Sequence, residues 1–227
     1  MQPATPDFAA ITSDYSAAIE GGSYTDAERV VQGALAGGAS GAEVFTRVLT
    51  PAMYRIGERW GRAEITAADE HLATAITNRI VGLIYAELAV EMPTSKERVL
   101  IAAVEGDHHV MGLRMVADVL EGAGYEVIYL GADTPLAGLI VAIERHPPSV
   151  VALGGTAPWS ASTLADTVQA VRAAYPSMPI VLGGAQAERA ASAAADELIF
   201  VVRDAESVVE VVAAAIRAGP RADRAGR

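Results

Sequence analysis

Asp107, His109 and Gly112 form a short run, Asp-x-His-x-x-Gly, whose histidine could bind a metal. A neutral imidazole is a good ligand for a transition metal, and a carboxylate two residues earlier can accept the proton of its other ring nitrogen. The run follows a strand-like apolar stretch, residues 99–104, and opens a helix-like one, residues 113–120. An open α/β sheet holds its ligand at such a place.

A single imidazole does not make a metal site, because ordinary protein sites use about three or four ligands. The chain has no cysteine, and its four histidines are His71, His108, His109 and His146. His146 precedes two prolines near the end of a predicted helix, so we expect it to be structural. Any metal is therefore expected to arrive already enclosed in a cofactor.

Three motifs have the order and spacing of the cobalamin-binding domains of the methionine synthase type. That family carries Asp-x-His-x-x-Gly, then Ser-x-Leu, then Gly-Gly. Here 41 residues separate Gly112 from Gly154, and 26 residues separate Thr156 from the pair Gly183 and Gly184. Each motif alone has a plainer explanation, since glycine-rich strand ends are common in any doubly wound sheet. Their joint spacing favours the resemblance.

The resemblance implies that cobalamin binds with its own base displaced and with His109 as the lower cobalt ligand. The residues implied to contact the cofactor are Asp107, His108, His109, Val110, Gly112, Gly154, Thr156, Gly183 and Gly184. The chain departs from the family pattern at Gly154, which replaces the serine, and at Thr156, which replaces the leucine. That serine contacts the buried benzimidazole tail in the family, and the Thr156 hydroxyl could take its place.

Composition excludes several other classes of protein. The 227 residues are 52% hydrophobic, which suits one or two globular domains. No apolar run approaches the roughly 20 residues of a membrane span, and no signal peptide opens the chain, so we expect a cytoplasmic protein. Absence of cysteine excludes a thioether-linked pigment. A net charge of -11 opposes direct binding to nucleic acid.

Residues 1–93 are predicted to form a four-helix bundle cap. Three capping boxes mark helix starts, Thr25 with Glu28, Ser40 with Glu43 and Thr66 with Asp69, while Gly21-Gly22 and Gly37-Gly38 mark ends. One apolar stripe contains Phe45, Val48, Leu49, Ala52, Met53, Ile56 and Trp60. Pro51 interrupts that stripe, so we expect the helix to bend or restart there.

The pattern changes after a linker, Met92–Lys96, to short β-rich runs that alternate with helices. Residues 97–219 are therefore predicted to be an α/β domain with a five-stranded parallel sheet, and residues 220–227 a disordered tail. The predicted strands are 99–104, 126–130, 150–153, 180–182 and 198–202. Thr134-Pro135 is predicted to open one helix, and residues 205–218 to form the last. The resemblance implies a flavodoxin-like, Rossmann-like strand order, 2-1-3-4-5.

A second motif lies in the predicted cap, where nine residues separate Trp60 from Glu70 and His71. A tryptophan at a helix end offers a flat face to an adenine or a corrin edge, and a nearby glutamate can accept hydrogen bonds from a ribose or an adenine. The simpler explanations are core packing for Trp60, helix-dipole stabilisation for Glu70 and solvent exposure for His71. The Trp-x9-Glu-His motif resembles that of adenosylcobalamin-binding light sensors related to the repressors of bacterial carotenoid genes.

This second resemblance spans residues 7–219 and implies a photoreceptor rather than an enzyme. Light would break the cobalt–carbon bond and change the conformation, self-association or partner binding of the protein. Repressor-type relatives have a histidine after the tryptophan that can bind cobalt once adenosyl is lost, whereas here that position is Gly61. Water, or His71 after rearrangement, would then take the upper site.

Such repressors carry an amino-terminal helix-turn-helix, which we do not find here, so we expect the output to pass to a transcription regulator or signalling enzyme. The resemblance also makes a homo-oligomer plausible and leaves open a second, noncovalent bilin pigment. Methylcobalamin and hydroxocobalamin remain alternative cofactors to adenosylcobalamin.

The chief alternative function is a corrinoid methyl-carrier subunit of a methyltransferase. A weaker one is a response-regulator-like domain without cofactor.

Overall fold

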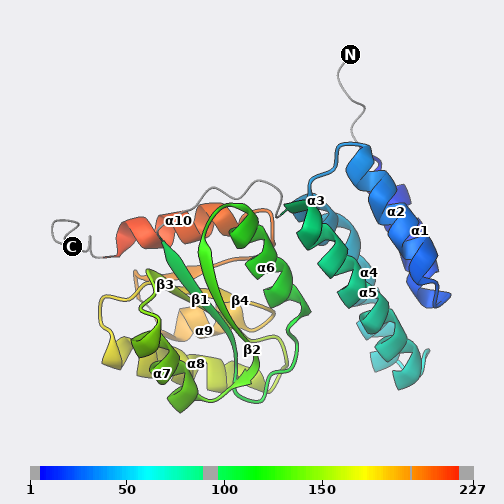
Figure 1. The fold of residues 1–227 in the computed structure, drawn as a ribbon. Helices are drawn as coiled ribbons and strands as arrows, with labels where there is room; N and C mark the ends of the chain where they lie inside the picture. Colours follow the sequence, from blue (N-terminus) through cyan, green and yellow to red (C-terminus); the bar gives the residue numbers. More distant parts are fainter. Residues whose placement is uncertain (1–5, 89–96, 195, 220–227) are drawn as a thin grey trace. The chain divides into compact units, whose positions relative to one another are not determined.

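The computed structural model describes residues 6–88, 97–194 and 196–219. These residues fall into two compact units, one before and one after the segment 89–96 (Figure 1). The first unit is helical, and the second is a parallel sheet flanked by helices. The predicted linker, Met92–Lys96, and the predicted tail, residues 220–227, lie outside the described residues.

The helices of the first unit form a bundle. They are α1 (Phe8–Glu20), α2 (Tyr24–Ala36), α3 (Gly41–Val44), the π-helical turn η1 (Phe45–Leu49), α4 (Thr50–Gly61) and α5 (Ala67–Leu88). Because α3, η1 and α4 follow one another without a break, they act as one rod, and α1, α2 and α5 supply the other three. Helix α5 contacts each of the other rods, so the unit has one core. Its largest fully buried side chains include Tyr15, Ile19, Phe45, Leu49, Ile80 and Ile84.

Two of the three predicted capping boxes are present. Ser40 and Glu43 exchange hydrogen bonds between side chain and backbone, and Thr66 and Asp69 do the same. The predicted start at Thr25 is wrong. Ser23 is the N-cap of α2 and accepts from the Asp26 N–H at 3.2 Å, because two capping sequences overlap here and the earlier one follows directly on the preceding turn.

The predicted bend or restart at Pro51 takes the form of a π-helical turn just before the proline. Pro51 has no N–H, so it cannot donate to the carbonyl of Arg47 one turn earlier. The hydroxyl of Thr12, from α1, lies 2.7 Å from that carbonyl oxygen. The same hydroxyl lies 2.7 Å from the carbonyl oxygen of Phe8 in its own helix, so its single hydrogen is shared between two acceptors. The helix continues to Gly61.

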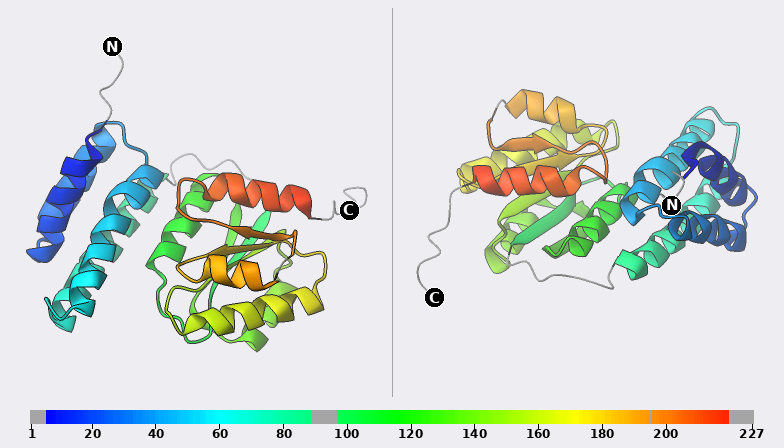
Figure 2. Two further views of the ribbon diagram at one scale, coloured as in Figure 1. Left: turned by 180° about the vertical axis from the view of Figure 1, so that it is seen from behind. Right: turned by 90° about the horizontal axis from the view of Figure 1, so that it is seen from above.

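The second unit alternates strands with helices. Its elements are β1 (Arg98–Val104), α6 (Met111–Gly122), β2 (Glu126–Thr134), α7 (Leu136–Arg145), β3 (Val150–Gly154), α8 (Ser160–Ala174), β4 (Ile180–Gly183), α9 (Ala187–Ala194), β5 (Ile199–Val201) and α10 (Val208–Ala218). All strand pairs are parallel, in the order β2-β1-β3-β4-β5, which confirms the predicted sheet. Helices α6 and α10 cover one face, and α7, α8 and α9 cover the other (Figures 1 and 2).

The predicted strands β1, β3 and β4 differ from the structure by one residue each, and the differences at β2, β5 and α10 are larger. Strand β2 runs on to Thr134, so that residue is not the N-cap of α7; Pro135 occupies the cap position. Strand β5 is only three residues long, and α10 begins at Val208 rather than at Ala205. The pairing of β2 with β1 contains two register shifts near the end of the strands. The pattern of residue types in the sequence did not predict these shifts.

The order of the strands fixes where a ligand can bind. Strand β1 lies between β2 and β3, so the chain leaves its carboxyl end toward one side of the sheet and leaves that of β3 toward the other. The two loops that follow, residues 105–110 and 155–159, therefore start side by side and run to opposite sides of the sheet, and a crevice forms at such a point in open α/β sheets. Ligands of open α/β sheets bind in this crevice.

Candidate functional site

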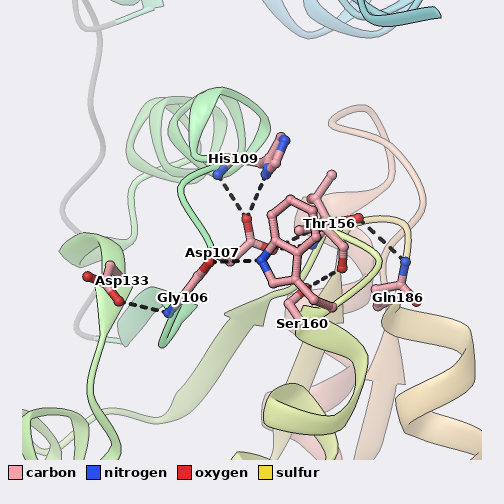
Figure 3. Close-up of polar contacts among 9 residues, drawn as sticks. Gly106, Asp107, His109, Asp133, Thr156, Ser160 and Gln186 are labelled. Carbon is pink, nitrogen blue, oxygen red and sulfur yellow. Dashed lines mark hydrogen bonds and ion pairs between the residues drawn. The ribbon is translucent and has the colours of Figure 1, made fainter. Parts of the chain in front are cut away.

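The buried carboxylate of Asp107 joins the two loops at the carboxyl ends of β1 and β3 (Figure 3). Its Oδ1 accepts from the backbone N–H and from Nδ1 of His109, both at 2.9 Å. Its Oδ2 accepts from the backbone N–H groups of Thr156 at 2.5 Å and Ala157 at 3.1 Å. Burial raises the pKa of Asp107, but these donors, with the Ser160 hydroxyl, outweigh it and lower the pKa to about 2. Asp107 is therefore ionised at neutral pH.

The ionised Asp107 sets the tautomer of His109. A carboxylate can only accept, so Nδ1 of the imidazole must carry a proton and donate it. In the neutral ring the lone pair then lies on Nε2, on the far side of the ring from Asp107. The His109 side chain is 55% exposed, so this nitrogen is accessible to a ligand. The pair has the arrangement in which an imidazole binds a transition metal while a carboxylate holds its orientation.

The other residues of the predicted motif lie at or just before the start of α6. His108 is exposed, and Val110 occupies the N-cap position of α6. Gly112 lies in the first turn of α6, and a Cβ added there would meet nothing within 4 Å. Packing of the protein therefore does not require glycine at position 112, whereas close approach of a ligand would.

Gly154 stands where the resemblance led us to expect a serine, and the structure shows what fills that space. A Cβ at Gly154 would lie 2.2 Å from Cδ1 of Leu113, so the leucine side chain from α6 occupies the position. Thr156 is two residues further on, and its hydroxyl oxygen lies 2.7 Å from the position of a Cβ on Gly184. The predicted replacement of the serine hydroxyl by Thr156 remains a prediction.

Gly183 is the last residue of strand β4, and Gly184 follows it next to the loop of residues 155–159. Gly184 has φ +88°, and a Cβ there would lie 2.5 Å from the carbonyl oxygen of Gly155 and 2.7 Å from Oγ1 of Thr156. Gln186 continues the contact, since its backbone N–H donates to the Gly155 carbonyl at 3.0 Å. Glycine at 184 is thus required by the close approach of two backbone segments.

Sequence reasoning missed two residues of this site. The indole of Trp159 donates from Nε1 to the carbonyl of Gly106 at 3.2 Å, and its ring centroid is 6.4 Å from that of His109. Asp133, at the end of β2, accepts from the Gly106 N–H at 2.7 Å. Asp133 has φ +48°, a left-handed conformation that is unusual outside glycine. Of these two residues, only Trp159 could have been predicted from the sequence, because it lies five residues after Gly154, just beyond a predicted strand.

Trp60, Glu70 and His71 lie at one end of the helical unit, because α4 ends at Gly61 and α5 begins at Ala67. Trp60 is 54% exposed, so the core of the helical unit does not use it, contrary to the simplest explanation of its place on the apolar stripe. Glu70 accepts from Thr74 at 2.7 Å through one oxygen, and its other oxygen is 2.6 Å from Nδ1 of His71. A flat aromatic face and a glutamate–histidine pair are thus presented at the same helix ends.

Comparison with known families identifies the chain. Residues 97–213 match the B12 binding domain, and residues 12–85 match a second B12 binding domain family. The chain belongs to the B12 binding domain family. This assignment confirms the resemblance drawn from the spacing of Gly112, Gly154 and Gly183. The cofactor bound by this family, cobalamin, carries its own cobalt, and the part of the chain that is described contains no cluster of three acidic or histidine side chains able to hold a bare metal ion.

Relatives of this cobalamin-binding chain include a corrinoid protein and a transcriptional repressor. It is 31% identical over 128 residues to the trimethylamine corrinoid protein of Methanosarcina barkeri, matching 56% of this chain and 59% of the relative. It is 33% identical over 148 residues to the transcriptional repressor CarH of Myxococcus xanthus, matching 64% of this chain and 48% of the relative. The chain thus spans about half the length of these relatives.

The fold of the cobalamin-binding chain also resembles that of a solved corrinoid protein. The monomethylamine corrinoid protein of Methanosarcina barkeri superimposes with a TM-score of 0.75 at 21% identity, covering 90% of this chain and 97% of that one. This likeness concerns the fold. None of the helices in the described segments is both long enough and apolar enough to cross a membrane.

Proposed function

We propose that this protein is a light sensor that binds adenosylcobalamin, with His109 as the lower cobalt ligand. The observation that carries the proposal for the lower ligand is the Asp107–His109 pair. Its carboxylate is ionised and bonded to Nδ1, and the opposite ring nitrogen is accessible. When bound, the cofactor would supply a light-labile cobalt–carbon bond. Asp107 would hold the imidazole in the ligating tautomer throughout.

Exposure of Trp60 supports adenosylcobalamin over methylcobalamin. A tryptophan that its own bundle leaves 54% exposed has an aromatic face free to pack against an adenine. Glu70 and His71 lie at the same end of the helical unit, and their hydrogen-bonding atoms suit a ribose or an adenine. A methyl group offers none of these residues a partner. We assign recognition of the adenosyl group to Trp60, Glu70 and His71.

We further propose that the signal passes to a protein partner, a transcription regulator or a signalling enzyme, and involves self-association of the chain. The net charge of -11 supports a protein partner over nucleic acid, because nucleic-acid binding needs cationic side chains to displace counterions. A cytoplasmic location fits this role. Binding of an additional bilin is a variant of the proposal that the same reconstitution tests, since a bilin adds its own visible absorption.

The second candidate function is a corrinoid methyl carrier of a methyltransferase. Similarity to the trimethylamine corrinoid protein supports it, at nearly the same identity as the similarity to CarH. The two candidates differ in the upper cobalt ligand that the protein must hold. Of these two candidates, the light sensor is the one that needs the adenosyl group.

One experiment separates the two functions. The full chain is reconstituted in darkness with adenosylcobalamin or methylcobalamin, and absorption spectra and the elution volume in size-exclusion chromatography are recorded before and after green light. A light sensor prefers adenosylcobalamin and changes its spectrum and its elution volume on illumination. Preference for methylcobalamin, with methyl transfer to a methyltransferase, would establish the carrier function instead. His109→Ala is the control, and it should abolish the spectrum of histidine-bound cobalt.

A further inference from the structure

Trp159 is a large aromatic side chain that the protein leaves open next to the proposed cobalt ligand. It is 67% exposed, more than any other large hydrophobic side chain among the described residues. Its ring is tilted by 58° to that of His109, with 6.4 Å between centroids. Exposed aromatic surface beside a binding residue is a feature of ligand sites, because burying it on binding is favourable.

The indole is held in place at its polar edge. Nε1 donates to the carbonyl of Gly106, and the N–H of the same glycine donates to Asp133, so the Gly106 residue is fixed from both sides. Gly106 immediately precedes Asp107, the residue that orients His109. Trp159 therefore supports the loop that carries the proposed ligand, in addition to exposing an aromatic face there.

Two glycines on either side of the Asp107–His109 pair have open space beside them. A Cβ on Gly106 or on Gly112 would meet nothing within 4 Å. A macrocycle that binds through Nε2 of His109 extends sideways over the residues next to the imidazole, and Trp159 is such a residue. A planar corrin can cover an indole, whereas a small ligand at Nε2 would leave it in water.

We infer that Trp159 forms a wall of the corrinoid site, where its indole contacts the lower face of the bound macrocycle and its hydrogen bond to Gly106 positions the His109 loop. This inference rests on the proposed binding of cobalamin through His109. It assigns Trp159 to the lower side of the cofactor, and Trp60 to the adenosyl side. The two tryptophans, which are the only ones in the chain, should therefore respond to different parts of the cofactor.

Oxidation of tryptophan, followed by mass spectrometry of the full chain with and without cobalamin, tests the contact. Hydroxocobalamin and adenosylcobalamin have the same lower face, so both should protect Trp159 by about tenfold in oxidation rate. Trp60 should be protected more by adenosylcobalamin than by hydroxocobalamin. Equal oxidation of Trp159 in the free and the cobalamin-bound protein would overturn the inference.

Two substitutions separate the aromatic contact from the hydrogen bond. Trp159→Phe keeps an aromatic face and removes the N–H donor, and Trp159→Ala removes both. We expect Trp159→Ala to release hydroxocobalamin about tenfold faster than the parent, and Trp159→Phe to fall between the two. A release rate for Trp159→Ala equal to that of the parent would also overturn the inference. If the alanine variant does not fold, the phenylalanine variant and the protection of the parent still decide the outcome.

The outcomes also separate this inference from the proposed function. A parent chain that takes up no cobalamin in the dark overturns both. A chain that takes up cobalamin with the spectrum of a histidine ligand, but leaves Trp159 equally open to oxidation, overturns the Trp159 assignment alone.

Discussion

Oδ1 of Asp107 lies 2.9 Å from both the backbone nitrogen and the Nδ1 atom of His109, so one carboxylate oxygen fixes the loop and the imidazole together. Its second oxygen fixes the neighbouring loop through Thr156 and Ala157. Asp107 is thus a structural link between β1 and β3 as well as the partner of the proposed cobalt ligand. Effects on folding and on cofactor binding should therefore appear together when it is changed.

Asp107→Asn should lower the free energy of unfolding by about 2–3 kcal/mol, because the amide keeps one acceptor oxygen and turns its NH₂ group toward the two N–H donors that the other carboxylate oxygen accepted. The measurement is urea unfolding of the cofactor-free protein. His109→Ala is the matched control, since it removes only the bond to Nδ1 and should cost less than half as much. Equal losses in the two variants would show that the bonds to the neighbouring loop contribute little.

Asp107 and Asp118 should give opposite pH dependences of stability. The pKa of Asp107 is lowered to about 2 in the folded protein. Its contribution to the free energy of unfolding is therefore fully present above its unfolded pKa of 3.8, and it is lost as the pH falls from about 4 to 2. Burial raises the pKa of Asp118 to about 6 despite the bond to Arg114, and its Oδ2 has no hydrogen-bond donor within the described residues. The contribution of Asp118 to the free energy of unfolding is therefore fully present below pH 3.8, and it is lost as the pH rises to about 6.

Asp118→Asn measures this second effect directly. Relative to the variant, the parent should lose stability as the pH rises from about 4 to 6 in a series of urea unfolding curves. A constant difference between parent and variant across that range would mean that Asp118 keeps its ordinary pKa in the folded protein.

Gly112 and Gly184 should respond differently to alanine. Gly184→Ala should reduce the free energy of unfolding by at least about 2 kcal/mol, since φ is +88° and the Cβ would lie 2.5 Å from a backbone oxygen. Gly112→Ala meets no atom and lies in a helix, so the cofactor-free protein should gain about 0.5–1 kcal/mol. The same methyl group should weaken cobalamin binding, which equilibrium dialysis would measure. Unchanged affinity would place the corrin away from Gly112.

Trp60→Ala should reduce the preference for adenosylcobalamin over methylcobalamin by roughly tenfold, with little effect on stability because the side chain is mostly exposed. Competition between the two cofactors in darkness gives the ratio. Tyr54→Ala is a suitable control, as Tyr54 lies on the same helix and is 61% exposed. An identical ratio in parent and Trp60→Ala would remove Trp60 from the site.

The sequence was sufficient to predict the sheet and the family. The carboxyl ends of parallel strands lie at the same edge of a sheet. The spacing from Gly112 to Gly154 and Gly183 therefore predicted that these residues, which are far apart in the sequence, lie at one edge of the sheet. Helix ends were less certain where signals overlapped. Ser23 and Thr25 each begin a capping sequence, and local sequence does not say which of two adjacent caps has the extended backbone that capping needs.

Residue types and their spacing determined the resemblance to a cobalamin-binding family, and they placed a histidine and its carboxylate partner at the end of the first strand. Only the tertiary structure decided that Leu113 occupies the space beside Gly154, that the core of the helical unit leaves Trp60 exposed, and that Trp159 contacts the Gly106 loop. Each of these depends on contacts between segments far apart in the chain or on how much of a side chain packing covers. Local patterns specify elements and motifs, but the neighbours of a side chain are set by how those elements pack.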